Sequence, residues 1–171
     1  MGRGAKTNMT RLRGRAPRCE RLIDKTPHGH WKTSTLIGAL DVCSMRCSMM
    51  VDGPVNADIF CAFIEQVLAP ELRTGDIVVM DNLSSHKGAK IRQVIEGRGA
   101  RLIYLPPYSP DLNPIEMIFS KVKQTLRGLA LRTQHGLWTS MQSVLNRVTP
   151  SDAANCFTHC GVLATKWLKA L

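Results

Sequence analysis

The first candidate for chemistry is Asp81, which directly follows a short apolar run at residues 77–80. A continuous apolar run of this length is typical of a strand buried on both faces of a sheet. Ligands and catalytic groups of open α/β sheets usually lie at the carboxyl ends of such strands, so Asp81 is a candidate metal ligand. A second interpretation stays equally open: Asp81 begins the turn at residues 81–85 and accepts hydrogen bonds from nearby backbone amides.

The second candidate is Glu116, which follows a proline-rich segment at residues 105–114. The prolines stiffen the exit from the preceding strand and restrict where the next helix can begin. Asn113 is a good N-cap residue, and Pro114 suits the first helical turn. Glu116 is then the third helical residue, where a carboxylate either binds a ligand or closes a capping box with the N-cap residue.

The helix after Asn113 is expected to carry Glu116 on a polar face. At about 100° per residue, Ser120, Lys123 and Arg127 fall on the stripe that contains Glu116. The apolar side is formed by Ile115, Ile118, Phe119, Val122 and Leu126. This pattern fits a carboxylate that binds a metal ion next to two basic residues, Lys123 and Arg127, that bind nucleic-acid phosphates. Simple balance of surface charges also fits the same spacing.

The segments before Asp81 predict a hairpin and a helix. Two β-leaning runs at residues 33–42 and 46–51 indicate an antiparallel pair, although the break between them lacks the glycine that hairpin turns favour. Asn56 can cap a helix over residues 57–68, whose apolar residues repeat at helical spacing.

The segments around the two acids predict a parallel βαβ unit. Apolar runs at residues 77–80 and 102–105 are the strands, and residues 88–96 form the connecting helix, with Ile91 facing inward. From residue 133 onward, apolar periodicity predicts one or two helices that pack against the rest. The expected fold class is therefore α/β, with a mixed sheet flanked by helices.

The charge distribution indicates a polyanionic partner. The net charge is +10 and the pI is about 9.7, which favours nucleic acid. Residues 1–32 hold nine Lys and Arg against two Asp and Glu. The candidates for DNA contact in this stretch are Arg11, Arg13, Arg15, Arg18 and Lys32. A solvated basic tail without a specific partner is the alternative.

The domain organisation follows from glycine and proline content. Glycines and a proline near the start predict no regular structure before about Arg21. Residues 1–20 are accordingly interpreted as a poorly ordered basic arm and residues 21–171 as one domain.

The sequence contains no apolar run of about 18 residues and no apolar core of a secretory signal, so a soluble cytoplasmic protein is expected. In that compartment cysteines are thiols. Two cysteine pairs have a spacing that invites a zinc interpretation, Cys43 with Cys47 and Cys156 with Cys160, with His159 beside the second. Structural zinc sites usually use tighter spacing, which favours a role as small apolar side chains.

Two long segments around the acids resemble the DDE transposases of bacterial insertion sequences in the mariner superfamily. They are residues 78–87 (VVMDNLSSHK) and residues 105–116 (LPPYSPDLNPIE). Between Asp81 and Glu116 lie 34 residues, the spacing that this family uses. The resemblance also extends over residues 6–9, 27–32 and 56–72.

The resemblance implies a ribonuclease-H-like fold in which three acids hold two Mg²⁺ or Mn²⁺ ions. Such ions activate a water or a DNA 3′-hydroxyl, stabilise the leaving oxygen and favour in-line attack on a phosphodiester. Hard carboxylate oxygens suit these ions. Carried onto this chain, Asp81 is the second acid and Glu116 the third.

The resemblance also implies supporting residues. Asn82 and His86 fall in the loop after Asp81, where they orient that carboxylate, contact DNA or brace the loop. Lys87 ends the same segment and is a further DNA-binding candidate. Asn113, near the end of the second motif, is expected to support the site.

One position departs from the family pattern. The family's first acid lies a few residues before the segment that matches residues 5–8, usually within an Asp-Glu pair. Residues 1–4 here are Met-Gly-Arg-Gly, and no carboxylate precedes Glu20. The first acid, the first strand and the family's helix-turn-helix domain are therefore expected to be missing. Three residues could replace the family's first acid by residue type, although none lies at its position: Asp24, Asp41 and Asp52.

Three functions stay open from the sequence. The first is a transposase domain for metal-dependent DNA cleavage and strand transfer, truncated or frameshifted, whose active form includes an upstream product. The second is a catalytically inactive remnant that binds DNA or inhibits full-length transposase. The third is a resolvase-like nuclease of the same fold that acts on branched DNA. The expected partners are DNA, as transposon ends and target, and a second copy or a full-length transposase.

Overall fold

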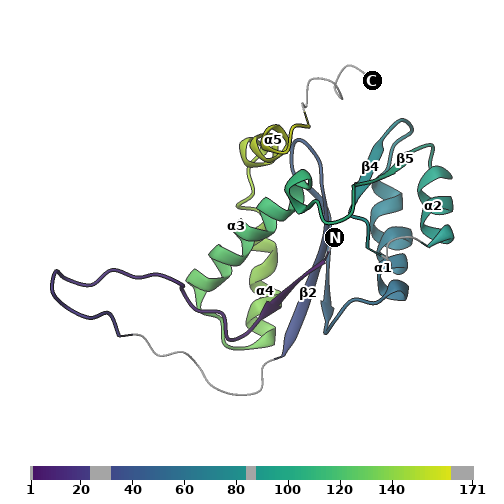
Figure 1. The fold of residues 1–171 in the computed structure, drawn as a ribbon. Coiled ribbons are helices and arrows are strands. Elements are labelled where there is room, and N and C mark those ends of the chain that lie inside the picture. The colour runs from purple at the N-terminus through teal and green to yellow at the C-terminus, as the bar shows by residue number, and fades with distance from the viewer. Residues whose placement is uncertain (1, 24–31, 84–87, 163–171) are drawn as a thin grey trace.

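The computed structural model describes residues 2–23, 32–83 and 88–162 (Figure 1). The strands are β1 (Gly2–Lys6), β2 (Thr33–Leu40), β3 (Met45–Asp52), β4 (Ile77–Met80) and β5 (Arg101–Tyr104). The α-helices are α1 (Ala57–Phe63), α2 (Ala89–Glu96), α3 (Pro114–Leu129), α4 (Gln134–Leu145) and α5 (Pro150–His159). A π-helical turn (Ile64–Leu68) and a 3₁₀ turn (Ala69–Glu71) continue α1. The predicted mixed α/β class is confirmed.

Strand β1 corrects the interpretation of the N-terminal segment. It pairs antiparallel with β2, from Gly2 opposite Ile37 to Lys6 opposite Thr33, and Ala5 is buried in the core. The predictions that no regular structure precedes Arg21 and that the first strand is missing are therefore wrong for these residues. Glycine has a low intrinsic preference for strands, but pairing and burial within a sheet outweigh that preference. Residues 7–23 contain no helix or strand.

The hairpin of β2 and β3 forms as predicted, without a glycine in its turn. The two strands pair antiparallel from Ser34 opposite Asp52 to Leu40 opposite Met45, with an irregularity at the turn end. The side chain of Asp41 stabilises this turn: its Oδ1 accepts hydrogen bonds from the amides of Cys43 and Ser44, each at 2.7 Å. The side chain thus supplies a turn that the backbone alone does not favour.

Strands β4 and β5 and helix α2 form the predicted parallel βαβ unit. The strands pair in parallel from Ile77 opposite Arg101 to Met80 opposite Tyr104. The prediction that β4 is buried on both faces is wrong, because Val79 is 43% exposed. Among the described residues β4 has a strand neighbour on one edge only, and its other edge borders a cavity.

Two hydrophobic cores lie on opposite faces of the β1–β3 sheet. Adjacent residues of β2 divide between them, because successive side chains of a strand point to opposite faces. Leu36 packs with residues of α3, α4 and α5, and Ile37 packs with α1, the π-helical turn and the βαβ unit. Figure 1 shows the same division, with α3 to α5 on one side of β2 and α1 and α2 on the other. Strand β2 therefore contributes side chains to both cores.

The C-terminal helices are fastened by polar contacts as well as by the core. Trp138 Nε1 of α4 donates to Ser34 Oγ of β2 at 2.9 Å. Lys121 of α3 pairs with Asp152 of α5. Hydrogen bonds from Lys121 and Thr149 hold the pKa of Asp152 well below its usual value. The packing helices predicted after residue 133 are thus confirmed, and within the described residues up to 162 they are α4 and α5. No helix in the described part of the chain is long and apolar enough to cross a membrane.

An ion pair joins the two sheets. Arg46 Nη1, at the start of β3, donates to Asp76 Oδ2, just before β4, at 3.0 Å, and the side chains are 20% and 26% exposed. The Arg46 guanidinium also donates to the carbonyl of Glu71. The backbone amide of Arg73 donates to the same Asp76 oxygen at 2.9 Å. The start of β4 is thereby held beside the end of the hairpin.

Replacing Arg46 by Ala is expected to lower the free energy of unfolding by about 2 kcal/mol, because Asp76 then stays partly buried without its cation. Urea titration measures the loss. Arg92→Ala is the matched control: its pair with Glu96 is 48% exposed on both sides, and it also lies over the Tyr104 ring. We expect that change to cost no more than about 1 kcal/mol. Equal losses would contradict a structural role of the Arg46 pair.

Candidate metal site and DNA-binding surface

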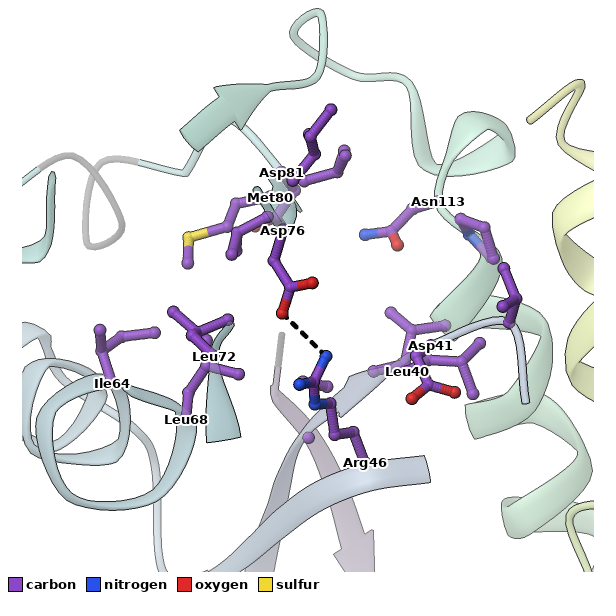
Figure 2. A pocket seen from close by; sticks show the side chains of 18 of the residues that line it. Leu40, Asp41, Arg46, Ile64, Leu68, Leu72, Asp76, Met80, Asp81 and Asn113 are labelled. Atoms are coloured by element: carbon purple, nitrogen blue, oxygen red, sulfur yellow. Dashed lines mark hydrogen bonds and ion pairs between the residues drawn. The ribbon is translucent and has the colours of Figure 1, made fainter. Parts of the chain in front are cut away.

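A cavity of about 310 Å³ lies between β2 and β4 (Figure 2). It is lined by the end of β2 and its turn (residues 38–42), by β4 with its flanking residues (75–81) and by the start of α3 (residues 113–115). Apolar side chains of α1 and the π-helical turn complete the wall. The predicted site residue Asp81 and the start of the helix that carries Glu116 thus border the same space.

Asp81 lies at the carboxyl end of β4, as predicted. The amide of Leu105 donates to the carbonyl of Met80 at 2.8 Å, so the parallel ladder holds the backbone up to the residue before Asp81. Asp81 and Asn82 are half-buried. The turn interpretation of Asp81 falls partly on residues 84–87, which lie outside the described residues.

Glu116 lies in the first turn of α3, as predicted, and is half-buried. Asn113 is the N-cap residue, but its side chain makes no capping hydrogen bond. Figure 2 shows the Asn113 amide directed into the cavity, and the residue is 7% exposed. The reciprocal capping box is therefore not formed at this helix, whereas α5 has one between Thr149 and Asp152. A role of Glu116 beyond helix capping gains support from this difference.

Three side-chain oxygens of these motifs are buried without a hydrogen bond, namely Asp81 Oδ1, Asn82 Oδ1 and Glu116 Oε1. Asp81 and Glu116 do take part in other interactions. Two carboxylates and an amide oxygen are hard ligands, which fit Mg²⁺ or Mn²⁺ better than zinc. Within residues 2–23, 32–83 and 88–162, no three His, Cys, Asp or Glu side chains are grouped so that they could hold an ion. The residues therefore fit part of a divalent-metal site.

The acids considered as substitutes for the missing first ligand have other contacts. Asp41 borders the cavity, but its Oδ1 is engaged by the turn amides of the hairpin. Asp52 accepts a hydrogen bond from Gln134 Nε2 at 2.6 Å. Asp24 lies outside the described residues. Neither described acid is therefore arranged as an additional ligand.

The polar face of α3 is confirmed. Ile115, Ile118, Phe119, Val122 and Leu126 are all buried, as the periodicity predicts. On the opposite side Ser120 is exposed, and Glu116, Lys123 and Arg127 are half-buried. An acid and two basic residues thus share one accessible face of the helix.

The basic arm approaches the same helix. Arg11 lines a second cavity of about 420 Å³ together with Lys121 and other residues of α3 and with Arg147, which follows α4. Arg132 Nη1 donates to the carbonyl of Met9 at 3.0 Å, which fastens the start of the arm. Arg13, Arg15, Arg18 and Lys32 are exposed. Sequence reasoning missed Arg147, because nothing in its local pattern places it beside a residue 136 positions earlier.

Two predicted site residues are not covered by the structure: His86 and Lys87 lie outside the described residues, so their roles stay predictions.

Four of the six cysteines are half-buried or buried, namely Cys47, Cys61, Cys156 and Cys160. Cys156 and Cys160 are buried in α5 and at its end, whereas Cys43 is exposed. Burial is the main cause that raises the pKa of the Cys47 thiol to about 11, and it also raises the pKa of Cys156 and Cys160. Such thiols stay protonated and unreactive near neutral pH.

Comparison with known families gives one match, to the model of the DDE superfamily endonucleases, over residues 3–137. No curated protein matches the chain. The family match includes both motifs, from β1 to the start of α4.

Solved structures of the Mos1 transposase are similar to this chain. The paired-end complex with the left transposon end has a TM-score of 0.72 and 16% identity, over 99% of this chain and 53% of that one. The paired-end complex with Mn has a TM-score of 0.67 and 15% identity, over 99% and 53%. The catalytic domain with raltegravir and Mg has a TM-score of 0.61 and 17% identity, over 81% and 74%. The chain spans about half the length of the transposase chains in the complexes. These likenesses confirm the ribonuclease-H-like fold.

The carboxylates of the site are expected to bind Mn²⁺ together. Asp81→Asn and Glu116→Gln should each weaken Mn²⁺ binding by roughly tenfold or more, because each removes an anionic ligand of nearly unchanged shape. Isothermal titration calorimetry measures the affinity. Asp58→Asn is the control, since Asp58 is an exposed acid in the first turn of another helix. An unchanged affinity in both site variants would refute shared ligation.

Proposed function

Because the chain belongs to the DDE superfamily of endonucleases, we propose that it is the catalytic domain of a DNA transposase. The observation that carries the proposal is the arrangement of the two motifs. One ends a β-strand at Asp81, the other begins helix α3 before Glu116, and both border one cavity. The similar Mos1 structures include a paired-end complex with the left transposon end and a strand transfer complex, which supports the same substrate class.

Asp81 and Glu116 are proposed to hold a divalent cation, Mg²⁺ or Mn²⁺. When bound, such an ion activates a water or a DNA 3′-hydroxyl and stabilises the leaving oxygen of a phosphodiester. The chain's own structure positions the two carboxylates. Pairing of β4 with β5 fixes the backbone before Asp81, and the buried face of α3 fixes the direction of Glu116. The Asn113 amide, directed into the cavity, is proposed to orient one of these carboxylates.

The DNA backbone is proposed to follow the polar face of α3 toward the basic arm. Lys123 and Arg127 lie on the face that carries Glu116, and Arg11 lies against the same helix. Basic side chains of this kind hold phosphates and fix the register of the duplex without reading its sequence. Lys87 is proposed to add a contact from the loop after Asp81.

The lack of a third grouped metal ligand among the described residues favours a second function. No group of three possible metal ligands occurs among the described residues, so binding of DNA without cleavage is the alternative. A chain of this kind would occupy transposon ends or associate with a complete transposase and inhibit it. Cleavage and binding therefore need separate measurements.

Cleavage is tested by nicking of supercoiled plasmid with Mg²⁺ or Mn²⁺. The enzymatic proposal predicts metal-dependent nicking that Asp81→Asn abolishes, because the ion then loses one of its two proposed carboxylate ligands. The Asp58→Asn variant should keep the wild-type rate. Retained DNA binding with no nicking in either metal would support the alternative function instead.

DNA binding is tested by its salt dependence. Replacing Arg11, Arg13, Arg15 and Arg18 together by Ala should reduce the slope of log affinity against log salt by up to about 3.6, since each phosphate contact contributes about 0.9. Fluorescence anisotropy with a labelled duplex measures the slope.

The control for that experiment removes the same charge from exposed arginines on the opposite half of the molecule: Arg73, Arg92, Arg98 and Arg101. We expect this control to change the slope by less than one contact's contribution, about 0.9. An equal loss of slope in both variants would show that net charge alone, and no basic surface, drives binding.

A further inference from the structure

Tyr108 differs from the other aromatic residues because its side chain is fully exposed, at 102%. Aromatic rings usually contribute large buried areas to cores and interfaces. The other aromatic residues in the described part of the chain do so at least in part: Phe60, Phe63 and Phe119 are buried, Tyr104 and Phe157 are half-buried, and the indole of Trp138 donates to Ser34. The ring of Tyr108 contributes no comparable packing to this fold.

The backbone of Tyr108 has an unfavourable conformation. Its φ is 56°, in the left-handed region that suits glycine or asparagine better than tyrosine. A residue stays in such a conformation only where the surrounding structure fixes it. Here Pro107 stiffens the chain before Tyr108, and after it the amide of Asn113 donates to the carbonyl of Pro110 at 3.0 Å. The loop therefore holds the exposed ring in a defined position.

The loop that carries Tyr108 connects the two acidic motifs. It begins at Leu105, whose amide donates to the carbonyl of Met80, the residue before Asp81. Because Tyr108 comes three residues after Leu105, their Cα atoms are at most about 11 Å apart. That distance corresponds to about three nucleotides of one DNA strand, at about 3.4 Å each. A strand bound at the proposed metal site would pass within a few nucleotides of the ring.

Other apolar side chains near the acids are also exposed, namely Leu83 at 51%, Leu112 at 41% and Met117 at 39%. Each lies within four residues of Asp81 or Glu116 along the chain. The polar face of α3 adds basic side chains to the same region. Proteins that bind unpaired nucleic acid combine basic side chains, which follow the backbone, with aromatic rings on which bases stack.

The stacking of DNA itself restricts what such a ring can contact. Inside an intact duplex the neighbouring base pairs cover both faces of each base. A ring on a protein surface can therefore stack only on a base that has left the helix or lies beyond its end. Unstacking costs least for bases that are already single-stranded. Stacking of this kind tolerates any sequence, because every base has a π face.

We propose that Tyr108 is a stacking platform for an unpaired nucleobase beside the phosphodiester at the metal site. The inference rests on the proposed DNA-cleaving function and adds the form of the substrate: DNA with unpaired bases next to the cleavage position, and not a continuous duplex. The ring holds the strand in place while the carboxylates and their ion act on the phosphate.

The proposal is tested by comparing two labelled duplexes of the same sequence, one blunt and one with a short unpaired overhang. Overhangs at the 3′ and the 5′ end are measured separately by fluorescence anisotropy. The wild-type chain should bind one overhang duplex about fivefold or more tightly than the blunt duplex, because stacking of a single base favours binding by at least that factor. The basic surface contacts both duplexes, so the ratio of the two affinities reports the unpaired base.

Two substitutions at Tyr108 separate stacking from a structural role. Tyr108→Phe keeps the ring and should keep the affinity ratio. Tyr108→Asn removes the ring but suits the left-handed backbone, so the ratio should fall to about one while the urea midpoint of unfolding does not fall. A lower midpoint in Tyr108→Asn would show instead that the ring belongs to the fold.

The matched control is Leu129→Asn, which also replaces an exposed apolar side chain by asparagine. Leu129 is 42% exposed and ends α3, about 20 Å along the helix from Glu116. This variant should keep the wild-type affinity ratio.

A photochemical probe locates the contact. With 5-iododeoxyuridine in the overhang, ultraviolet light should crosslink the DNA to the peptide that contains Tyr108. Three results would overturn the inference: equal affinity of the wild-type chain for all duplexes, an unchanged ratio in Tyr108→Asn, or crosslinks to other peptides only. Failure to bind any of the duplexes would overturn the proposed DNA-binding function as well, which distinguishes the two failures.

Discussion

The ion pair between Arg46 and Asp76 connects two sheets that, among the described residues, share no strand pairing. It holds the start of β4 beside the end of β2, and the core around Ile37 packs between the same elements. The position of Asp81 follows from this constraint, because β4 is four residues long and Asp81 comes directly after it. Without the connection, the strand that presents the acid would be held only by β5, its helix and the apolar core around Ile37.

The second acid is placed by a different part of the molecule. Helix α3 buries one complete face in the core that contains Leu36, so its polar face, with Glu116 in the first turn, has a defined direction. Asp81 thus follows a strand that packs in the core around Ile37, whereas Glu116 begins a helix that packs in the core around Leu36, and Asp81 and the residues just before Glu116 line one cavity. A metal ion that joins the two acids would also join the two halves of the fold. Metal affinity and folding stability are then expected to be linked.

The elements that depend on local sequence signals were predicted correctly from the sequence. The features that depend on long-range contacts were not. The strand before Asp81, and the helix start at Asn113, follow from an apolar run and from proline and cap preferences. Strand β1 could not be predicted, because its glycines favour no strand and only pairing with a segment about 30 residues later orders them. The exposure of Val79 and the pairing of Arg46 likewise depend on residues distant in the chain.

Asp81 and Glu116 are proposed to hold one divalent cation between them. Crystals of the chain soaked in MnCl₂ and measured at the manganese absorption edge test this arrangement. We expect an anomalous difference peak about 2.2 Å from a carboxylate oxygen of each residue. A well-ordered site with no such peak, or manganese bound only at other acids, would contradict it.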